Sequence, residues 1–159
     1  MEKVNIGVLS HAHGHINTYC QEMMHFEDVD LIATWDDNEE RGRTNAQKFG
    51  LDFCTTPEEV VNNDHIDTVL IGVETNRHAD FVELAAEAGK NILLQKPMAT
   101  TLADCDRITK IINETGVKFS LAFQMRQDPV NRKIKELVEQ NVLGKIAVVR
   151  RRHCIPVLL

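Results

Sequence analysis

The sequence has no long apolar run and no excess of positive charge, and each absence argues against a class of protein. No stretch approaches the ~20 consecutive apolar residues that a membrane-spanning helix needs, so we do not expect an integral membrane protein. Lys and Arg number 18 against 24 Asp and Glu, which gives a net charge of −6. That balance argues against a nucleic-acid-binding surface, because the only dense basic cluster is Arg150–Arg152.

Cysteine is also scarce, and its four copies are widely spaced. Cys20, Cys54, Cys105 and Cys154 include no Cys-x-x-Cys pair. Met1 is followed almost at once by a strand-like pattern, with no secretory leader before it. We therefore expect reduced thiols in a cytoplasmic protein, each acting as a small apolar side chain rather than as a redox or metal-binding group.

What the sequence does contain is an alternation of short apolar runs and longer helical stretches. Its 159 residues, 43% of them hydrophobic, are enough for one domain with a sizeable core. The short runs are continuously apolar, as in strands that are buried on both faces. Strands that alternate with helices predict an α/β fold with a doubly wound parallel sheet. The expected strands are Val4–Leu9, Leu31–Trp35, Thr68–Val73, Asn91–Leu94, Lys118–Leu121 and Lys145–Arg150.

Local signals mark the ends of the expected helices. Thr56, Thr101 and Asp128 are capping residues, and proline in the next position strengthens the first and the last of these signals. Residues 79–88 carry apolar side chains at helical spacing. A glycine suited to the left-handed conformation follows three helical stretches, at Gly50, Gly89 and Gly116.

The C-terminal part of the sequence is unusual. Lys145–Arg150 predicts a strand, and Cys154–Leu159 is an apolar tail. Because such a tail needs a surface to cover it, we expect the chain to be a piece of a longer protein. The expected organisation is a dinucleotide-binding domain over residues 1–144, followed by the start of a truncated second domain over residues 145–159.

The turn after the first strand has the features of a dinucleotide-binding loop. In open α/β sheets a diphosphate binds at this turn, against the free N–H groups and positive dipole of the next helix. The usual three glycine positions are occupied by Ser10, Ala12 and His15, with Gly14 one position early. Together with His13, these residues are the expected contacts of the diphosphate.

An acidic pair lies at the end of the second strand. Asp36 follows the turn at roughly 20 residues, the usual distance for a carboxylate that binds the adenosine ribose. Asp37 adds negative charge that would repel a 2′-phosphate, which favours NAD over NADP, although Arg41 lies near enough to weaken the preference. The alternative is a solvated turn that caps the next helix through Asn38, and the two interpretations are compatible.

Three alternating histidines suggest a different chemistry. His11, His13 and His15 follow a first strand, as do the His-x-His pairs of some zinc-dependent barrel hydrolases. Gly14 and the onset of a helix interrupt the strand, and the chain is too short for a complete barrel. His78 is the only remote candidate ligand. We therefore favour nucleotide contact and predict no metal site, with polar loop residues that bind nothing as a further alternative.

Together these features resemble the N-terminal domain of the Gfo/Idh/MocA family of NAD(P)-dependent oxidoreductases. The resemblance extends from Val4 to about Arg150 and depends on linked motifs rather than on any single one. The family's Asp-x-Val-x-Ile-x-Thr-Pro-x-x-x-His segment and its Ala-Gly-Lys-x-Val-x-x-Glu-Lys-Pro run both have counterparts. The matching segments are Ile6–His15 with Asp36, Asp67–His78, Ala88–Pro97, Arg126–Pro129 and Leu143–Ile146.

The resemblance assigns the chemistry to Lys96, at the end of a strand beside the expected nicotinamide ribose. Its ammonium group would hydrogen-bond to the hydroxyl being oxidised and stabilise the developing alkoxide. The alternative is a lysine that points into water. Further residues expected to line the coenzyme are Gly72, Val73, Asn76, His78 and Gln95. For the segment that contains Asn76 and His78, helix capping by Thr75 or Asn76 is the alternative.

The sequence departs from the family pattern in three places. The loop after the first strand keeps one glycine, Val73-Glu74 replaces Thr-Pro, and Gln95 replaces the usual Glu. Gln95 can hydrogen-bond to a ribose or to the backbone, but it offers no carboxylate to Lys96. These departures affect the expected coenzyme affinity more than the fold.

The resemblance implies hydride transfer between NAD(P) and a sugar, polyol or related hydroxy or keto compound, in a homo-oligomeric parent protein. Hydride transfer needs a substrate held next to the nicotinamide, and the family's second domain provides that pocket. The 159-residue chain alone is therefore expected to bind nucleotide without turnover. A non-catalytic NAD(P)-binding sensor is the alternative that the reduced glycine loop favours, whereas the retained Lys96-Pro97 favours the enzyme.

Overall fold

A computed structural model describes residues 3–152 of the chain. The chain divides into two compact units, the first ending at Phe123 and the second beginning at Gln124. The first unit contains the sheet and the site and is described first. The predicted domain limits at residues 144 and 145 concern a longer protein and stay a prediction.

The first unit is built on one parallel sheet with the strand order β3-β2-β1-β4-β5-β6. This order confirms the predicted doubly wound α/β fold, because the chain moves outward from β1 in one direction and then returns to continue in the other. The two-residue strand β3 was not predicted. The strands are β1 (Val4–Leu9), β2 (Val29–Trp35), β3 (Asp52–Phe53), β4 (Thr68–Ile71), β5 (Asn91–Gln95) and β6 (Phe119–Ala122).

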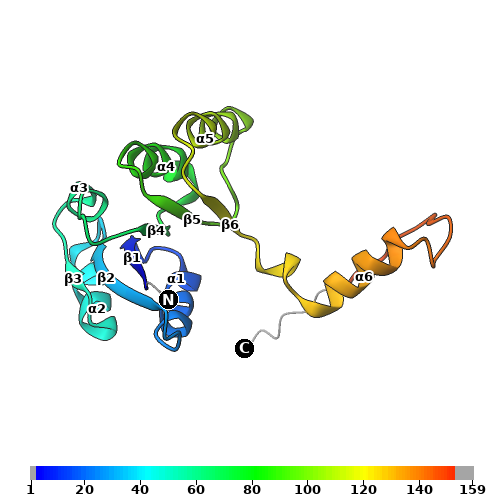
Figure 1. Ribbon diagram of the computed structural model, residues 1–159, viewed down its shortest axis with the longest axis horizontal. Helices are drawn as coiled ribbons and strands as arrows, with labels where there is room; N and C mark the ends of the chain where they lie inside the picture. The colour runs from blue at the N-terminus through cyan, green and yellow to red at the C-terminus, as the bar shows by residue number, and fades with distance from the viewer. Residues whose placement is uncertain (1–2, 153–159) are drawn as a thin grey trace. The chain divides into compact units, whose positions relative to one another are not determined.

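Helices cover both faces of the sheet (Figure 1). Helices α1 and α2 lie on one face, and α3, α4 and α5 lie on the other. The predicted caps are confirmed. The hydroxyls of Thr56 and Thr101 each accept a hydrogen bond from the main-chain nitrogen three residues later. Gly50 and Gly116 end their helices with positive φ. The helices are α1 (Gly14–Met23), α2 (Glu39–Phe49), α3 (Pro57–Val61), α4 (His78–Glu87) and α5 (Leu102–Thr115), with a short 3₁₀ helix η1 (Thr75–Arg77) before α4.

Each face of the sheet has its own apolar core. Neighbouring residues of β1 divide between them, since Val8 packs with α1 and α2 whereas Leu9 packs with the opposite cluster. Cys20 lies fully buried in the first of these cores, and burial raises the pKa of its thiol to about 12. Cys20, Cys54 and Cys105 are all free thiols. The buried, protonated Cys20 therefore acts as an apolar side chain, as predicted.

The second unit contains a 3₁₀ helix η2 (Gln124–Arg126) and helix α6 (Pro129–Glu139). Asp128 caps α6 by accepting a hydrogen bond from the main-chain nitrogen of Asn131 at 2.9 Å, as the sequence predicted. The strand predicted over Lys145–Arg150 is wrong, since these residues take no strand conformation. Apolar, β-branched residues favour a strand only where a neighbouring strand pairs with them. The apolar tail Cys154–Leu159 lies outside the described residues.

Among the helices of residues 3–152, none is both long and apolar enough to cross a bilayer.

Candidate functional site

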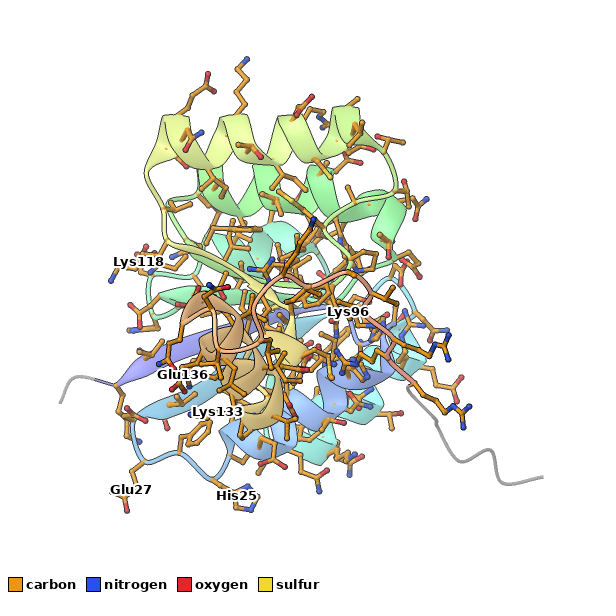
Figure 2. All side chains as sticks on the ribbon, turned by 90° about the vertical axis from the view of Figure 1, so that its right-hand side faces the viewer. His25, Glu27, Lys96, Lys118, Lys133 and Glu136 are labelled. Carbon is orange, nitrogen blue, oxygen red and sulfur yellow. The ribbon has the colours of Figure 1, made fainter. Side chains whose placement is uncertain are left out.

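Four loops meet at the edge of the sheet where the strands end. Ser10 follows β1, Asp36 follows β2, Gly72 follows β4 and Lys96 follows β5. Figure 2 shows Lys96 at this edge and Lys118, which precedes β6, at the opposite one. In doubly wound sheets, ligands bind at this edge where the strand order reverses, which here lies between β1 and β4.

Ser10 forms the sharp turn between β1 and α1. Its φ of 72° lies in the left-handed region, which few residues other than glycine adopt. The buried hydroxyl stabilises this turn, because it donates to Asp36 Oδ2 at 3.3 Å and accepts from the main-chain nitrogen of Ala12 at 3.1 Å. Ser10 thus has the conformation that the first glycine position of a dinucleotide-binding turn requires.

Gly72 allows α1 to lie close to the sheet. A Cβ at Gly72 would overlap the Ile16 side chain and lie 2.7 Å from the Ser10 carbonyl oxygen. The Gly72 carbonyl accepts a hydrogen bond from the main-chain nitrogen of His13 at 3.3 Å. Val73 is buried beside it. These residues therefore serve the contact between β4 and α1, and their predicted contact with a coenzyme stays a prediction.

Asp36 is buried and its carboxylate is already bonded. The side chain is 0% exposed and receives the Arg41 guanidinium on both oxygens, at 2.7–3.1 Å. Main-chain nitrogens of His11 and Asn38 also donate to it, at 2.7 and 2.9 Å. Burial alone would raise the pKa of Asp36, but these hydrogen bonds outweigh burial and hold the pKa below its ordinary value. The solvated-turn interpretation is therefore wrong for Asp36, although Asn38 does cap α2 as that interpretation expected.

Asp37 is the exposed carboxylate of the pair. It accepts hydrogen bonds from Arg41 at 2.9 Å and from Arg77 at 2.6 Å, and Arg77 also reaches Glu74 at 3.4 Å. The Arg77 guanidinium lies over the Phe81 ring, with its central carbon 4.9 Å from the ring centroid. Sequence reasoning missed Arg77 because it is 40 positions from Asp37 and in no motif that links the two.

The three histidines after β1 lie in different surroundings. His11 is buried, with Nδ1 2.8 Å from Asn17 Oδ1 and Nε2 3.0 Å from Thr34 Oγ1, and burial lowers its pKa. The rings of His13 and His15 lie next to each other, with centroids 4.8 Å apart. Within residues 3–152, no group of three or more His, Cys, Asp or Glu side chains is placed to hold a metal ion.

The end of β5 is tied to the turn after β1. Gln95 is 0% exposed, accepts a hydrogen bond from the Lys96 main-chain nitrogen at 2.7 Å and lies 3.3 Å from His13 Nδ1. This is the backbone hydrogen bond that the sequence allowed for Gln95. Lys96 is half-buried, and its peptide bond to Pro97 is cis.

His78 connects the loops that follow β4 and β5. Its ring is 1% exposed, with Nδ1 3.1 Å from the Met98 carbonyl oxygen and Nε2 3.2 Å from the Val73 carbonyl oxygen. Asn76 is exposed in η1. The capping alternative for this segment is wrong, because neither η1 nor α4 has a side-chain cap. The buried His78 therefore holds the loop that contains Lys96 in place, through its contact with the Met98 carbonyl oxygen.

Known proteins share this arrangement. The Gfo/Idh/MocA model, described as an oxidoreductase family with an NAD-binding Rossmann fold, matches residues 6–123. The chain belongs to the Gfo/Idh/MocA family. The resemblance seen in the sequence is thereby confirmed, and the site is that of a family with an NAD(P)-binding Rossmann domain.

Individual Gfo/Idh/MocA proteins match most of the chain but less than half of their own length. Myo-inositol 2-dehydrogenase from Thermotoga maritima is 32% identical over 92% of the chain and 44% of that protein. The NAD⁺-dependent scyllo-inositol 2-dehydrogenase from Bacillus subtilis is 30% identical over 72% of the chain and 34% of that protein. The crystal structure of myo-inositol 2-dehydrogenase from Lactobacillus plantarum has a TM-score of 0.81 at 20% identity, covers 91% of this chain and 43% of that chain, and shows likeness in fold alone.

The residues present fit a dinucleotide at one end of the site better than at the other. At the N-terminus of α1, Gly14 leaves open space and the first turn contains no acidic residue. The buried His15 Nδ1 has no hydrogen-bond partner among residues 3–152. These features suit a diphosphate. At the end of β2, Arg41 is already paired with Asp36, the carboxylate that the sequence predicts for the adenosine ribose. The site therefore fits the family's coenzyme if Arg41 yields part of its contact with Asp36.

Proposed function

We propose that the chain is the coenzyme-binding part of an NAD-dependent oxidoreductase that acts on a sugar or polyol. The observation that carries this proposal is the position of Lys96 at the strand ends, on the same edge as the turn at Ser10 and the N-terminus of α1. Two relatives named as inositol dehydrogenases support the substrate class. The rest of the length of these relatives is where we expect the substrate pocket.

Each part of the site has a separate task in this proposal. A bound nicotinamide coenzyme supplies or accepts a hydride. In reduction of a ketone, the Lys96 ammonium group hydrogen-bonds to the substrate oxygen, stabilises the charge that develops there and gives up its proton. In oxidation of the alcohol, the same proton returns to the Lys96 amine. Gln95 and His78 hold the main chain on either side of Lys96.

The charges at the end of β2 favour NAD over NADP. Among the residues that the structure describes, Asp36, Asp37 and Glu74 pair with two guanidinium groups, those of Arg41 and Arg77. The cluster therefore keeps a net negative charge, which repels a 2′-phosphate. We propose that the ribose hydroxyls bind at Asp36 and Asp37.

NADH is expected to bind the chain about tenfold more tightly than NADPH, because roughly 1.4 kcal/mol of repulsion is reasonable for such charges near a surface. Trp35, the only tryptophan, lies next to Asp36, so quenching of its fluorescence measures both affinities. The Asp37→Asn variant, which removes one negative charge shared by Arg41 and Arg77 and leaves the pair of Asp36 and Arg41 in place, should narrow or reverse the difference. Tighter binding of NADPH to the unmodified chain would contradict the preference.

Replacing Lys96 with methionine is expected to lower kcat of the complete protein by about 10²–10⁴-fold and to leave the Kd for NADH within about twofold. Turnover is followed by NADH absorbance with a panel of inositols and sugars. Lys118→Met, at the opposite edge of the sheet, is the matched control and should keep full turnover. Undiminished turnover in Lys96→Met would contradict the role of Lys96, whereas no turnover with any polyol in the unmodified protein would favour the non-catalytic sensor.

We also propose that the complete protein is a cytoplasmic homo-oligomer with a small-molecule substrate and no nucleic-acid or membrane partner. The free thiols of Cys20, Cys54 and Cys105 support a reducing compartment. The family resemblance supports the oligomeric state.

A further inference from the structure

The orientation of the buried Gln95 amide is fixed by its surroundings. The main-chain nitrogen of Lys96 can only donate, so the atom of Gln95 that it meets at 2.7 Å must be the oxygen Oε1. The other end of the amide is then the NH₂ group, which lies 3.3 Å from His13 Nδ1. Gln95 therefore points a hydrogen-bond donor at His13.

A second donor meets the same nitrogen of His13. The main-chain nitrogen of His15 lies 3.2 Å from Nδ1. An Nδ1 that carries a proton would face two N–H donors, so the arrangement is satisfied only when Nδ1 is bare and the proton is on Nε2. No acceptor within the described part of the chain engages Nε2.

We propose that Gln95 and the His15 main chain hold His13 as the neutral Nε2–H tautomer, and that this N–H donates a hydrogen bond to the diphosphate of the coenzyme. His13 is the N-cap residue of α1, where a diphosphate binds in this type of fold. The first half of the inference stands on the geometry alone, and the second half rests on the proposed function. Gln95 is a positioning residue in this proposal, since it acts through His13.

The surroundings of His13 favour its neutral form. Burial lowers the pKa of His13, and His15 of α1, Lys96 after β5 and His78 of α4 lower it further. The residue that the family pattern has in place of Gln95 is a glutamate. A carboxylate in that place would accept a hydrogen bond from a protonated Nδ1 and favour the imidazolium form. With Gln95, the His13 ring therefore offers a hydrogen-bond donor that carries no positive charge. With glutamate in that place, the His13 ring would be a positively charged donor.

The protonation state is measured on the unmodified chain by long-range ¹H–¹⁵N correlation spectra of the histidine rings. We expect His13 to show the Nε2–H pattern at neutral pH. In Gln95→Glu, we expect the pKa of His13 to rise by about one pH unit or more. Gln47→Glu, which adds the same charge at an exposed site on α2, is the control and should leave His13 unchanged. An Nδ1–H pattern or an imidazolium at neutral pH in the unmodified chain overturns the inference, whether or not the variant folds.

Titration with NADH tests the contact with the coenzyme. We expect the His13 ring resonances to shift in step with the quenching of Trp35 fluorescence. Quenching without a shift of His13 overturns the proposed contact and leaves the proposed function standing. If NADH causes no quenching and no shift, both the contact and the proposed function are overturned. The inference about the tautomer is tested separately, because the tautomer is read from the coenzyme-free spectrum.

Discussion

Replacing Arg41 with alanine is expected to lower the free energy of unfolding by about 2–3 kcal/mol, the upper range for losing hydrogen bonds to a charged group, because Asp36 is buried although Arg41 is partly exposed. The Asp36 side chain is 0% exposed, and three of its hydrogen bonds come from the Arg41 guanidinium. Without them the carboxylate keeps only main-chain donors and the Ser10 hydroxyl. Urea unfolding followed by Trp35 fluorescence measures the loss.

The effect of Arg41→Ala should depend on pH in a definite direction. The pKa of Asp36 is lowered in the folded state, so the stability that its ionised form contributes is present above the ordinary value of about 3.9 and is lost as pH falls through the folded-state pKa. The difference between the unmodified chain and the variant should therefore be largest near neutral pH and shrink below about pH 4. Removing Arg41 should also raise the pKa of Asp36, because burial then has less to oppose it.

Lys110→Ala is the matched control for Arg41. Lys110 forms an exposed pair with Glu114 at 3.8 Å on α5, and such pairs contribute about 0.3–0.5 kcal/mol. A loss in Arg41→Ala no larger than in this control would show that the guanidinium is not required to keep Asp36 buried. A difference that stayed constant from neutral to acid pH would contradict the ionised pair.

Replacing Gly72 with alanine should destabilise the chain by about 2–3 kcal/mol, at the upper end of the usual range for overpacked sites. The new Cβ would meet the Ile16 side chain and the Ser10 carbonyl oxygen, and the latter is main chain that cannot rotate away. Relief requires α1 to move away from β4. Because the same helix N-terminus faces the proposed diphosphate, the affinity for NADH should fall as well, which fluorescence titration measures.

Gly14→Ala provides the comparison for Gly72→Ala. Gly14 lies at the start of α1, four residues after Ser10, and a Cβ there meets no atom within 4 Å. Its substitution should change the free energy of unfolding by no more than about 0.5 kcal/mol. Equal thermal midpoints for the two variants would show that α1 does not need the close approach at Gly72.

The sequence was sufficient for the sheet because five of its strands are apolar runs that lie between clear helix signals. Strand β3 (Asp52–Phe53) was not predicted because two residues are too few to show a hydrophobic pattern. It is a strand through its pairing with β2. Lys145–Arg150 has the composition of a strand, but composition does not supply a neighbour to pair with. Strand prediction therefore succeeded where burial on both faces decides the conformation.

The candidate site was predictable only as far as its parts are local in sequence. The spacing of Ser10 and Asp36 placed both at the same edge of the sheet, since each directly follows a strand. The contacts of Arg77 with Asp37 and of Gln95 with His13 join residues 40 and 82 positions apart. Such contacts depend on the three-dimensional order of the strands, which a single sequence does not specify pair by pair.

In the proposed function, the contact between Asp36 and Arg41 makes binding of the adenosine ribose an exchange of partners rather than a simple addition. The guanidinium already supplies the donors that ribose hydroxyls would bring, so the Asp36 carboxylate has its hydrogen bonds without a coenzyme. Affinity at this end is then the difference between two sets of similar contacts, and most of the net gain must come from the diphosphate and nicotinamide. A mononucleotide such as AMP should accordingly compete poorly with NADH, even though it carries the whole adenosine.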